Sequence, residues 1–567
     1  MAGPSLFAPS PAYAVRLNDE LRRVENIPRR QWSEEEAKDM AEQLTELLKT
    51  HRGTMSLRPV QATALAEIGM RGGLFGIIRV GAGKTIISLL SASVAEAKRP
   101  VLLIPAKLVE KTQRDMEALS RHWQIQKTRI ITYEWLGRAQ AADALDSYKP
   151  DVIVCDEAHK LKNKSAAVTR RVARYMKANP TTKMIVMSGT ITKRSLHDYV
   201  HLIRWSLKTE VPLPEGYNDL ELWADALDER KGMLRRAEPG ALRVLCNPEE
   251  NQMWPTNPRE WARRAYRRRL IDTSGVVATQ ETSVDASIIV RYVEPPKSKA
   301  IDEAFDHLRK NWETPDGWPL ADALQVYRHA REMALGFYYK WEPRPPRAWL
   351  DARKAWCAFV RQTLSHSRSL DSELQVKRQF PNTPELREWE RVRDSFKPNT
   401  VPVWLDTSVL DYCKAWLATE SGILWTEHVF FAERLSKESG VPYYGSGNVG
   451  DAEKHHVEKP MILSIEAGRE GLNLQAWSSN FIVSPPPNGE RWEQLLGRTH
   501  RDGQEADEVT FDVAGFTIEQ VESFWQARRD AEYVAASTGS PQKLLVADHD
   551  FPTVEDVVHQ GGGRWRK

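Results

Sequence analysis

The feature that most constrains this chain is a glycine-rich turn, Gly81-Ala82-Gly83-Lys84-Thr85. An apolar run at 74–78 precedes it and a second apolar run at 86–90 follows it. This order predicts a buried strand, a tight turn and the first turns of a helix. Such a helix N-terminus favours a phosphate, because its free N–H groups and its dipole both attract negative charge. The full pattern G-x-x-x-x-G-K-[ST] would place another glycine at position 78, where this chain has Ile78.

The residues of this turn have distinct candidate roles in holding a nucleotide. The backbone around Gly81, Ala82 and Gly83 can surround phosphate groups. Lys84 can reach the β- and γ-phosphates, and the Thr85 hydroxyl can ligate Mg²⁺. The sequence therefore predicts a Walker A-type site for ATP and Mg²⁺.

Length and composition set the broad class. A chain of 567 residues should hold more than one core, and its net charge of +3 predicts no global basic surface, so a nucleic-acid surface would have to be local. The four cysteines form no C-x-x-C pair, which argues against a zinc module or a disulfide framework. The start of the chain resembles no signal peptide, and no run of about 18 apolar residues occurs. We therefore expect a soluble, cytoplasmic protein with no membrane partner.

Two stretches, 56–205 and 401–520, alternate short β-rich runs with helical patterns. This alternation predicts an α/β fold with two parallel-sheet lobes in tandem and active residues at the carboxyl ends of the strands. The expected strands are 76–80, 101–104, 130–132, 152–155 and 184–187 in the first stretch, and 423–425, 461–464, 481–484 and 509–513 in the second.

The remaining stretches are expected to surround these lobes. Residues 1–55 predict an N-terminal helical extension, with a helix that Ser33 and Glu36 cap in a capping box and that ends near Leu48. Residues 206–400 are dense in charge, Trp and Pro and predict a largely helical insertion that leads into the second lobe. Residues 521–567 predict a C-terminal helix and a flexible tail.

An acidic turn, Asp156-Glu157-Ala158-His159, directly follows the apolar run 151–155. A carboxylate at a strand end can hold the Mg²⁺ water shell, and a second one beside it can activate the attacking water. Asp156 suits the metal and Glu157 suits the general base. Ser188-Gly189-Thr190 closes the next expected strand, where hydroxyl groups can hydrogen-bond to the acidic turn. Upstream of the glycine turn, Arg58 and Gln61 are candidate nucleotide contacts, because a glutamine amide can pair with adenine.

The second expected lobe contains further candidate site residues. Residues 467–474, which include Gly471, follow an expected strand, and 494–504 contain Gln494, Arg498 and Arg501. Because Arg498 and Arg501 are three apart, we expect both to face the same way on one helix. Two guanidinium groups aimed across a cleft can stabilise charge on a γ-phosphate as arginine fingers.

Together these motifs resemble, in their order, those of the SNF2 group of superfamily 2 helicases. The resemblance rests on Leu57–Gln61, Gly81–Thr85, Ile104-Pro105, 131–134, Asp156–Asn163 with its DEAH box, Ser188–Thr190, 467–474 and the sequence Gly497-Arg498-Thr499-His500-Arg501-Asp502-Gly503-Gln504. It implies two RecA-like lobes at 56–205 and 401–520, a nucleic-acid-stimulated ATPase that uses ATP and Mg²⁺, and DNA as partner. It also implies that the protein is one of the compact members of this group, which occur in bacteria or phages.

The chain departs from the family pattern at several positions. Ile78 and Arg79 replace small or acidic residues, Arg469 replaces a second glycine, and Pro485-Pro486-Pro487 replaces a Trp-Asn-Pro turn. None of these changes removes a catalytic group. They bear on the DNA contacts and on the coupling of hydrolysis to movement.

Nucleic-acid affinity is expected to come from phosphate contacts and to depend on salt. The resemblance and the positive charges suggest a set of contact residues after the strands: Lys107, Tyr133, Lys160, Lys162 and Arg469. The run Arg263–Arg269 is the densest basic patch, and both DNA contact and structural ion pairing are open for it.

The resulting prediction is an ATP-dependent translocase that moves along duplex DNA in the cytoplasm of a bacterial or phage-infected cell. The alternatives are a strand-separating superfamily 2 helicase that acts on forks, R-loops or RNA, and an ATP-switched nucleic-acid clamp or assembly subunit with a protein partner.

Overall fold

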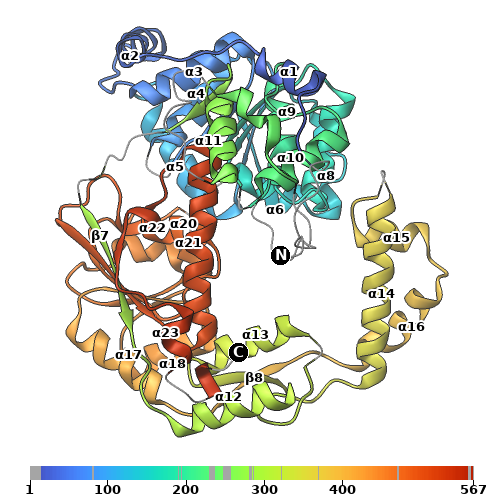
Figure 1. The fold of residues 1–567 in the computed structure, drawn as a ribbon, viewed down its shortest axis with the longest axis vertical. Coiled ribbons are helices and arrows are strands. Elements are labelled where there is room, and N and C mark those ends of the chain that lie inside the picture. The colour runs from blue at the N-terminus through green and yellow to red at the C-terminus, as the bar shows by residue number, and fades with distance from the viewer. Residues whose placement is uncertain are drawn as a thin grey trace, which may run out of the picture. The chain divides into compact units, whose positions relative to one another are not determined.

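The computed structural model describes residues 14–565, apart from 80–81, 190, 193, 229–236, 247–256, 280–283, 285, 321, 368–369, 469–470 and 560–562. The chain divides into two compact units (Figure 1). Unit 1 comprises Met1–Glu281 and Asp530–Gln542, and unit 2 comprises Thr282–Arg529 and Lys543–Lys567. Each unit contains a parallel sheet with helices around it, which confirms the predicted α/β class with two lobes.

The sheet of unit 1 has the strand order β3-β2-β4-β5-β1-β6, and every neighbouring pair is parallel. Its strands are β1 (Leu74–Ile77), β2 (Pro100–Ile104), β3 (Arg129–Thr132), β4 (Val152–Asp156), β5 (Lys183–Met187) and β6 (Val276–Ala278). The helices of this unit are α1 (Asp19–Glu25), α2 (Glu34–Leu48), α3 (Pro59–Arg71), α4 (Lys84–Val94), α5 (Val109–Leu119), α6 (Tyr133–Leu136), α7 (Ala144–Tyr148), α8 (Ala167–Ala178), α9 (Val200–Leu207), α10 (Tyr217–Leu227) and α11 (Pro258–Ile271).

Both faces of this sheet are buried, which explains why its strands are continuous apolar runs in the sequence. Successive side chains of β4 alternate between two cores. Val152 and Val154 belong to one cluster of buried residues, whereas Ile153 and Cys155 belong to the other. The carboxyl ends of the strands, where the candidate residues follow, are thus fixed by cores on both sides.

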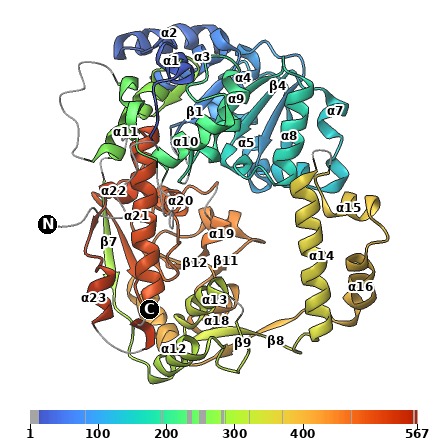
Figure 2. The same ribbon diagram turned by 45° about the vertical axis from the view of Figure 1, so that its right-hand side comes forward.

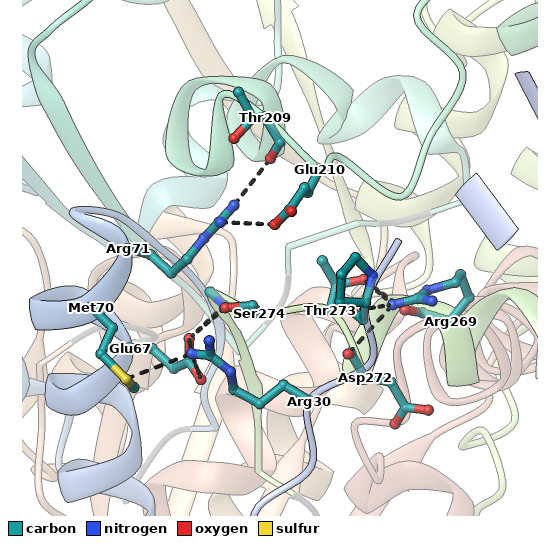
Figure 3. Close-up of polar contacts among 12 residues, drawn as sticks. Arg30, Glu67, Met70, Arg71, Thr209, Glu210, Arg269, Asp272, Thr273 and Ser274 are labelled. Atoms are coloured by element: carbon teal, nitrogen blue, oxygen red, sulfur yellow. Dashed lines mark hydrogen bonds and ion pairs between the residues drawn. The ribbon is translucent and has the colours of Figure 1, made fainter. Parts of the chain in front are cut away.

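Polar contacts join the N-terminal segment to the rest of unit 1. Helix α2 begins after Ser33, and the predicted capping box between Ser33 and Glu36 is present. Further along, Glu67 of α3 is 2% exposed and accepts hydrogen bonds from the Arg30 guanidinium at 3.1 Å and from the Ser274 hydroxyl at 3.2 Å (Figure 3). This buried carboxylate therefore joins the segment before α2 to the turn before β6.

The sheet of unit 2 has the order β11-β12-β10-β13-β14-β7-β15, again with parallel neighbours. Its strands are β7 (Ser287–Val293), β10 (Ile423–Thr426), β11 (Tyr443–Tyr444), β12 (Met461–Ser464), β13 (Ser479–Ile482), β14 (Glu508–Ala514) and β15 (Asp548–His549). In Figure 1, β7 is a green strand among orange and red ones, because it pairs with β14 from a much later part of the chain.

The helices of this part of the chain are α12 (Lys299–Asn311), α13 (Ala323–Met333), α14 (Arg347–His366), α15 (Glu373–Gln379), α16 (Pro384–Val392), α17 (Ser408–Thr419), α18 (Val429–Ser439), α19 (Ile465–Gly468), α20 (Gly489–Thr499), α21 (Ile518–Thr538), α22 (Lys543–Val546) and α23 (Val554–Val558). Strands β8 (Phe337–Trp341) and β9 (Thr400–Trp404) pair antiparallel and form the stem from which α14, α15 and α16 extend (Figure 2). Among the described residues, no helix is long and apolar enough to cross a membrane.

The two units divide the sequence differently from the predicted boundaries. Strands β6 and β7 both lie in the stretch 206–400, which was predicted to be an insertion, yet each completes one of the two sheets. The stretch 521–567 was predicted to end in a flexible tail, but Leu544, Phe551 and Trp565 are buried in the core of unit 2. These differences arise because β6, β7 and the scattered apolar residues gain their partners only from distant parts of the chain.

Candidate active site

The glycine turn leads from β1 into α4, as predicted. Gly81 lies outside the described residues, whereas Ala82 and Gly83 are described and half-buried. Gly83 has a φ of +78°, and a Cβ placed there would lie 1.9 Å from the Nε2 atom of Gln61. Position 83 therefore requires glycine, because of both its backbone conformation and the neighbouring side chain.

Gln61 contacts the glycine turn itself. It is 2% exposed, its Nε2 atom lies 3.4 Å from the Gly83 carbonyl oxygen, and its Oε1 atom accepts a hydrogen bond of 2.8 Å from the Arg58 backbone N–H. Arg58 is the N-cap of α3, and its side chain is exposed. The amide of Gln61 thus supports the turn. The sequence suggested only that this amide could pair with adenine.

Lys84 and Glu157 form the centre of the site in unit 1. The Lys84 Nζ atom lies 3.0 Å from the Glu157 Oε1 atom, and the His159 Nδ1 atom lies 3.2 Å from the Glu157 Oε2 atom. Lys84 begins α4, which follows β1, and Glu157 follows β4. The structure therefore brings together the lysine and the carboxylate that two separate sequence motifs had suggested.

The two neighbouring carboxylates have opposite pKa shifts. Burial raises the pKa of Asp156 to about 6, against the lowering effect of Lys84. Burial also opposes the charge on Glu157, but the Lys84 ammonium and His159 outweigh it and hold the pKa of Glu157 well below its ordinary value. Glu157 has a φ of +53°, a left-handed conformation that costs a non-glycine residue about 1–2 kcal/mol. Strain and divergent pKa values at one turn are typical of functional sites.

Asp156 and Thr85 fit the chemistry of a Mg²⁺ site. The Thr85 side chain is half-buried at the start of α4, and one carboxylate oxygen of Asp156 accepts the Glu157 backbone N–H at 3.0 Å. Among the described residues no group of three or more His, Cys, Asp or Glu could hold a metal ion alone. Mg²⁺ is commonly held by one or two protein oxygens together with substrate phosphates, and Thr85 and Asp156 have side-chain oxygens of that kind.

The segment after β5 contacts the acidic turn. The Ser188 hydroxyl lies 3.2 Å from the Nδ1 atom of His159, and both residues are buried. The same Nδ1 atom lies 3.2 Å from the Glu157 carboxylate, so Ser188 and Glu157 share this nitrogen, and the strand end lies against the acidic turn as expected. Thr190, the last residue of that motif, lies outside the described residues.

Tyr133 does not present its side chain to solvent. It is 3% exposed, and its hydroxyl donates a hydrogen bond of 2.8 Å to the Asp156 carbonyl oxygen. The structure thus argues against the predicted nucleic-acid contact, because the ring is packed in the core and the hydroxyl supports the acidic turn. Sequence reasoning missed this supporting role, since Tyr133 and Asp156 come from different strand ends.

Lys107 is exposed after β2, and Lys160 and Lys162 are half-buried after β4. Strands β2 and β4 are parallel neighbours, so these three lysines follow adjacent strand ends at the same edge of the sheet. Arg469, the remaining predicted contact, lies outside the described residues.

The arginine-rich run on α11 is largely committed to internal contacts. Arg263 donates to the Leu227 carbonyl oxygen at 2.6 Å. Arg269 is fully buried and donates to the Ile27 carbonyl oxygen at 2.7 Å. These contacts favour the structural alternative for the run over DNA contact.

In unit 2, the predicted motif that contains Arg498 and Arg501 contacts the predicted motif that contains Gly471. Arg498 is 5% exposed, and its guanidinium donates to the carbonyl oxygens of Gln494 at 3.0 Å and Leu472 at 2.9 Å. Arg501 also reaches the Leu472 carbonyl oxygen, at 3.3 Å, and donates to Asn473 Oδ1 at 2.6 Å. The expectation that both arginines lie on one helix is wrong, because α20 ends at Thr499.

Gly471 and Gln494 are the other predicted site residues of unit 2. Gly471 has a φ of +87° and immediately precedes Leu472. Gln494 is 3% exposed, and its buried Oε1 atom has no hydrogen-bond partner among the described residues. Burial lowers the pKa of Arg501, against the raising effect of Asp502 and Glu453. This half-buried arginine is the stronger candidate to act on an external anion.

Comparisons with known proteins support the family that the motifs indicate. Residues 95–243 match the model of the SNF2-related domain, a stretch that includes the acidic turn and the segment after β5. The chain is also similar to a protein described as "Transcriptional regulator ATRX homolog" of Drosophila melanogaster, with 35% identity over 68 residues. That alignment covers 12% of this chain and 5% of the relative. The domain match shows an SNF2-related domain in residues 95–243, and together with this similarity and the two parallel sheets it supports the resemblance to the SNF2 group of superfamily 2 helicases.

Proposed function

We propose that this protein is a nucleic-acid-stimulated ATPase that uses ATP hydrolysis to move along duplex DNA. The observation that carries the proposal is the contact of Lys84 with Glu157, which His159 also contacts, at the ends of two sheet strands in an SNF2-related fold. A lysine at a glycine turn and a carboxylate pair after a strand are the parts that phosphoryl transfer to water requires.

The free-state geometry suggests how the site responds to nucleotide. Lys84 now neutralises Glu157 at 3.0 Å. A triphosphate on the glycine turn would attract the Lys84 ammonium, and Glu157 would then lose its main cation. Its pKa would rise, and its carboxylate, still held by His159, would become available to accept a proton from water.

Mg²⁺ would neutralise charge on the phosphates, with Thr85 and Asp156 as its protein ligands. We assign to Arg501 the role of an arginine finger for the nucleotide. We assign Arg498 to the support of residues 471–473, because its guanidinium is committed to the Leu472 carbonyl oxygen.

For the nucleic acid, we propose that Lys107, Lys160 and Lys162 contact phosphates. These contacts would make binding dependent on salt and poor in sequence specificity. Replacing Lys107 by alanine should weaken duplex binding and lower the slope of log K against log salt by about 0.9, without changing ATP binding.

The experiment that tests the function is an ATPase assay at fixed salt without nucleic acid and with single-stranded DNA, duplex DNA or RNA of several lengths. The E157Q variant serves as the inactive control. Stimulation by duplex DNA that rises with length supports translocation on duplex.

A preference for single strands or RNA would instead favour a strand-separating helicase. ATP binding without stimulated turnover on any of these would favour a nucleotide-switched clamp that acts with a protein partner. Full activity of E157Q would remove the assignment of the site.

A further inference from the structure

Unit 2 contains a cavity whose lining includes no predicted site residue. Its volume is about 380 Å³, in the lower part of the range of about 300–1,000 Å³ that small-molecule sites occupy. The lining comes from strand β8, helix α13, the start of α14 and the hairpin 313–319, all within unit 2. Figure 2 shows α13 beside β8, near the foot of the helices α14, α15 and α16. The cavity therefore belongs to a different unit from the candidate ATP site around Lys84.

Internal contacts fix the hairpin that forms one wall of the cavity. The Gly317 backbone N–H donates to the Thr314 carbonyl oxygen at 2.8 Å, and Gly317 has a φ of +74°. The Asp316 carboxylate accepts the Thr314 hydroxyl at 2.6 Å and the Arg344 guanidinium at 3.0 Å. Arg344 also lies 5.6 Å from the centre of the Trp318 ring. These contacts join the hairpin to the segment after β8, so the wall that carries Trp318 is formed without a ligand.

Three aromatic side chains line the cavity: Trp318 of the hairpin, and Tyr339 and Trp341 of β8. Tyr339 and Trp341 are two residues apart, so their side chains leave the same face of the strand. All three residues are half-buried, and Leu320 and Leu350 add apolar surface to the lining. Aromatic rings at a cavity favour a flat ligand, because the faces of two ring systems can stack.

Arg328 of α13 supplies a positive charge without a partner. Its side chain is exposed and lines the cavity, and it makes no hydrogen bond or ion pair within the part of the chain that the structure describes. By contrast, Arg344 and Lys340, which also line the cavity, already have carboxylate partners at 3.0 Å and 2.9 Å. An anionic group in the cavity would therefore pair with Arg328 without breaking an existing pair.

Asp322 gives the lining an acceptor for N–H groups. Its Oδ1 atom caps α13 by accepting the Gln325 backbone N–H at 2.9 Å, and its other oxygen can accept a further donor. Carboxylates accept hydrogen bonds from bases in this way, for example from the amino group of cytosine. The cavity thus combines aromatic surface, a cation that suits a phosphate and an acceptor that suits the edge of a base.

Two other classes of ligand fit this lining less well. A quaternary ammonium group would also favour aromatic rings, but it would meet the charge of Arg328 and the guanidinium beside Trp318. A phosphotyrosine side chain would supply a ring and a phosphate, but its ring has no N–H group for Asp322. A nucleotide supplies a flat ring, N–H donors and a phosphate together.

We propose that this cavity binds an unstacked nucleobase together with its phosphate. The aromatic rings contact the base, Asp322 accepts from the base edge, and Arg328 pairs with the phosphate. The nucleotide comes from a single-stranded nucleic acid or from free nucleotide in solution, since both present the same chemistry. The inference goes beyond the proposed function, because movement along duplex DNA requires phosphate contacts and no base site.

The test measures binding of a fluorescent five-nucleotide single-stranded DNA while an ATP analogue saturates the ATP site. A strand of five abasic sugars is compared with it, because it carries the same phosphates without bases. We expect the wild type to bind the abasic strand about tenfold more weakly, and R328A to bind the base-containing strand about fivefold more weakly. Equal affinity of the wild type for the two strands would overturn the proposal.

Substitutions of Trp318 separate contact with the base from general packing. W318L keeps an apolar side chain without an aromatic ring, so we expect it to bind the base-containing strand about tenfold more weakly and the abasic strand as the wild type does. W318F keeps a ring and should stay within about threefold of the wild type. Equal effects of W318L on both strands, or no effect on either, would contradict the proposal. R328A serves alone if W318L does not fold.

A matched control for R328A is R361A. Arg361 is exposed on α14 and lies outside the cavity lining, about 16 Å along the helix from Leu350. R361A removes the same charge from the same unit, and we expect it to bind the base-containing strand as the wild type does. If R361A and R328A lose affinity equally, the effect is one of net charge and the proposal fails.

Competition identifies the source of the nucleotide. Displacement of the labelled strand by unlabelled single strands but not by mononucleotides assigns the cavity to a nucleic acid. Displacement by mononucleotides at similar concentrations assigns it to free nucleotide. A phosphotyrosine peptide that displaces the strand more strongly than either would overturn the assignment to a base.

The same assays distinguish this inference from the proposed function. A wild-type protein without ATPase activity that still prefers the base-containing strand would remove the function and keep the base site. A wild-type protein with duplex-stimulated ATPase activity that binds both strands equally would remove the base site alone.

Discussion

At the scale of single residues, the site in unit 1 depends on which partner Lys84 has. In the structure that partner is Glu157, whose pKa the lysine lowers. A general base held this way is a weak proton acceptor, and it becomes stronger only when an anion takes the lysine away. Under the proposed function, the same contact would keep the site inactive without nucleotide and prepare it for hydrolysis.

Two substitutions separate these roles. K84A should lower the ATPase rate by more than 100-fold and weaken ATP binding, because the lysine contacts the phosphates. E157Q should bind ATP as well as the wild type and still lose turnover by more than 100-fold, because an amide cannot accept the proton. Equilibrium binding of a fluorescent ATP analogue and steady-state ATPase rates measure both, and wild-type-like turnover of either variant would refute the assignment.

The raised pKa of Asp156 predicts a pH dependence of metal–nucleotide binding. Its pKa is about 6 in the folded protein, so the carboxylate is largely ionised at pH 7.5 and largely protonated at pH 5. Because Mg²⁺ needs the ionised form, its binding competes with the proton. The affinity for Mg²⁺–ATP should therefore fall below pH 6, by up to tenfold per pH unit, and stay flat above pH 7.

Titration of analogue binding with and without Mg²⁺ between pH 5 and 8 measures this effect. The D156N variant is the matched control, since it should bind Mg²⁺–nucleotide weakly at every pH and lose the dependence between pH 5 and 6. Equal Mg²⁺-dependent affinity of the wild type at pH 5 and pH 7.5 would contradict the assignment of Asp156 as a ligand.

At the scale of elements, the start of α4 depends on Gly83. An alanine there would adopt a left-handed conformation at a cost of about 1–2 kcal/mol, and its Cβ would collide with Gln61. We expect G83A to lower the thermal midpoint by a few degrees and to weaken binding of an ATP analogue at least tenfold.

A suitable control for G83A is G447A, because Gly447 lacks a positive φ and a Cβ there would have no neighbour within 4 Å. It should behave as the wild type in both thermal unfolding and analogue binding. In G83A/Q61A the collision is removed but the backbone strain remains, so the thermal midpoint of this double variant, compared with Q61A alone, should fall by less than that of G83A compared with the wild type. No fall relative to Q61A would mean that the strain is unimportant.

The sequence predicted elements well where the signal is local. Strands β2, β4 and β12 are short apolar runs buried on both faces, and their positions agree with the predicted ranges to within a residue. Strand β7 pairs with β14 and β15, which come from the far end of the chain, and no local pattern indicates such pairing. The end of α20 at Thr499, which leaves Arg501 outside the helix, was likewise not readable from residue spacing.

The candidate site shows the same limit. The contact between Lys84 and Glu157 follows from two motifs at strand ends, and each motif could be read from sequence. Whether an arginine on α11 meets DNA or a backbone carbonyl oxygen depends on the folded neighbours, and the charge pattern is the same in both cases. The burial of Tyr133 and the Asp530–Arg194 pair were inaccessible for that reason.

At the scale of the whole molecule, unit 1 is assembled from two parts of the chain, Met1–Glu281 and Asp530–Gln542. A fragment of residues 1–281 would leave Arg194 without the Asp530 carboxylate and Asp228 without the Tyr533 hydroxyl. We expect it to be less stable, by about 2 kcal/mol or more, than the same fragment joined to residues 530–542 through a flexible linker.

Chemical unfolding of the two fragments measures the difference. A fused copy that carries D530N and Y533F is the matched control, since it restores the chain length without the two polar contacts. If the bare fragment and the intact fusion unfold at the same denaturant concentration, residues 530–542 contribute nothing to unit 1.

This division of unit 1 has a consequence for how the protein is made. A ribosome synthesises the chain from its N-terminus, so the part of unit 1 that ends at Glu281 emerges long before Asp530 and Tyr533 exist. During that interval Arg194 lacks the Asp530 carboxylate and Asp228 lacks the Tyr533 hydroxyl. Unit 1 can therefore reach its final set of contacts only when synthesis of the chain is nearly complete.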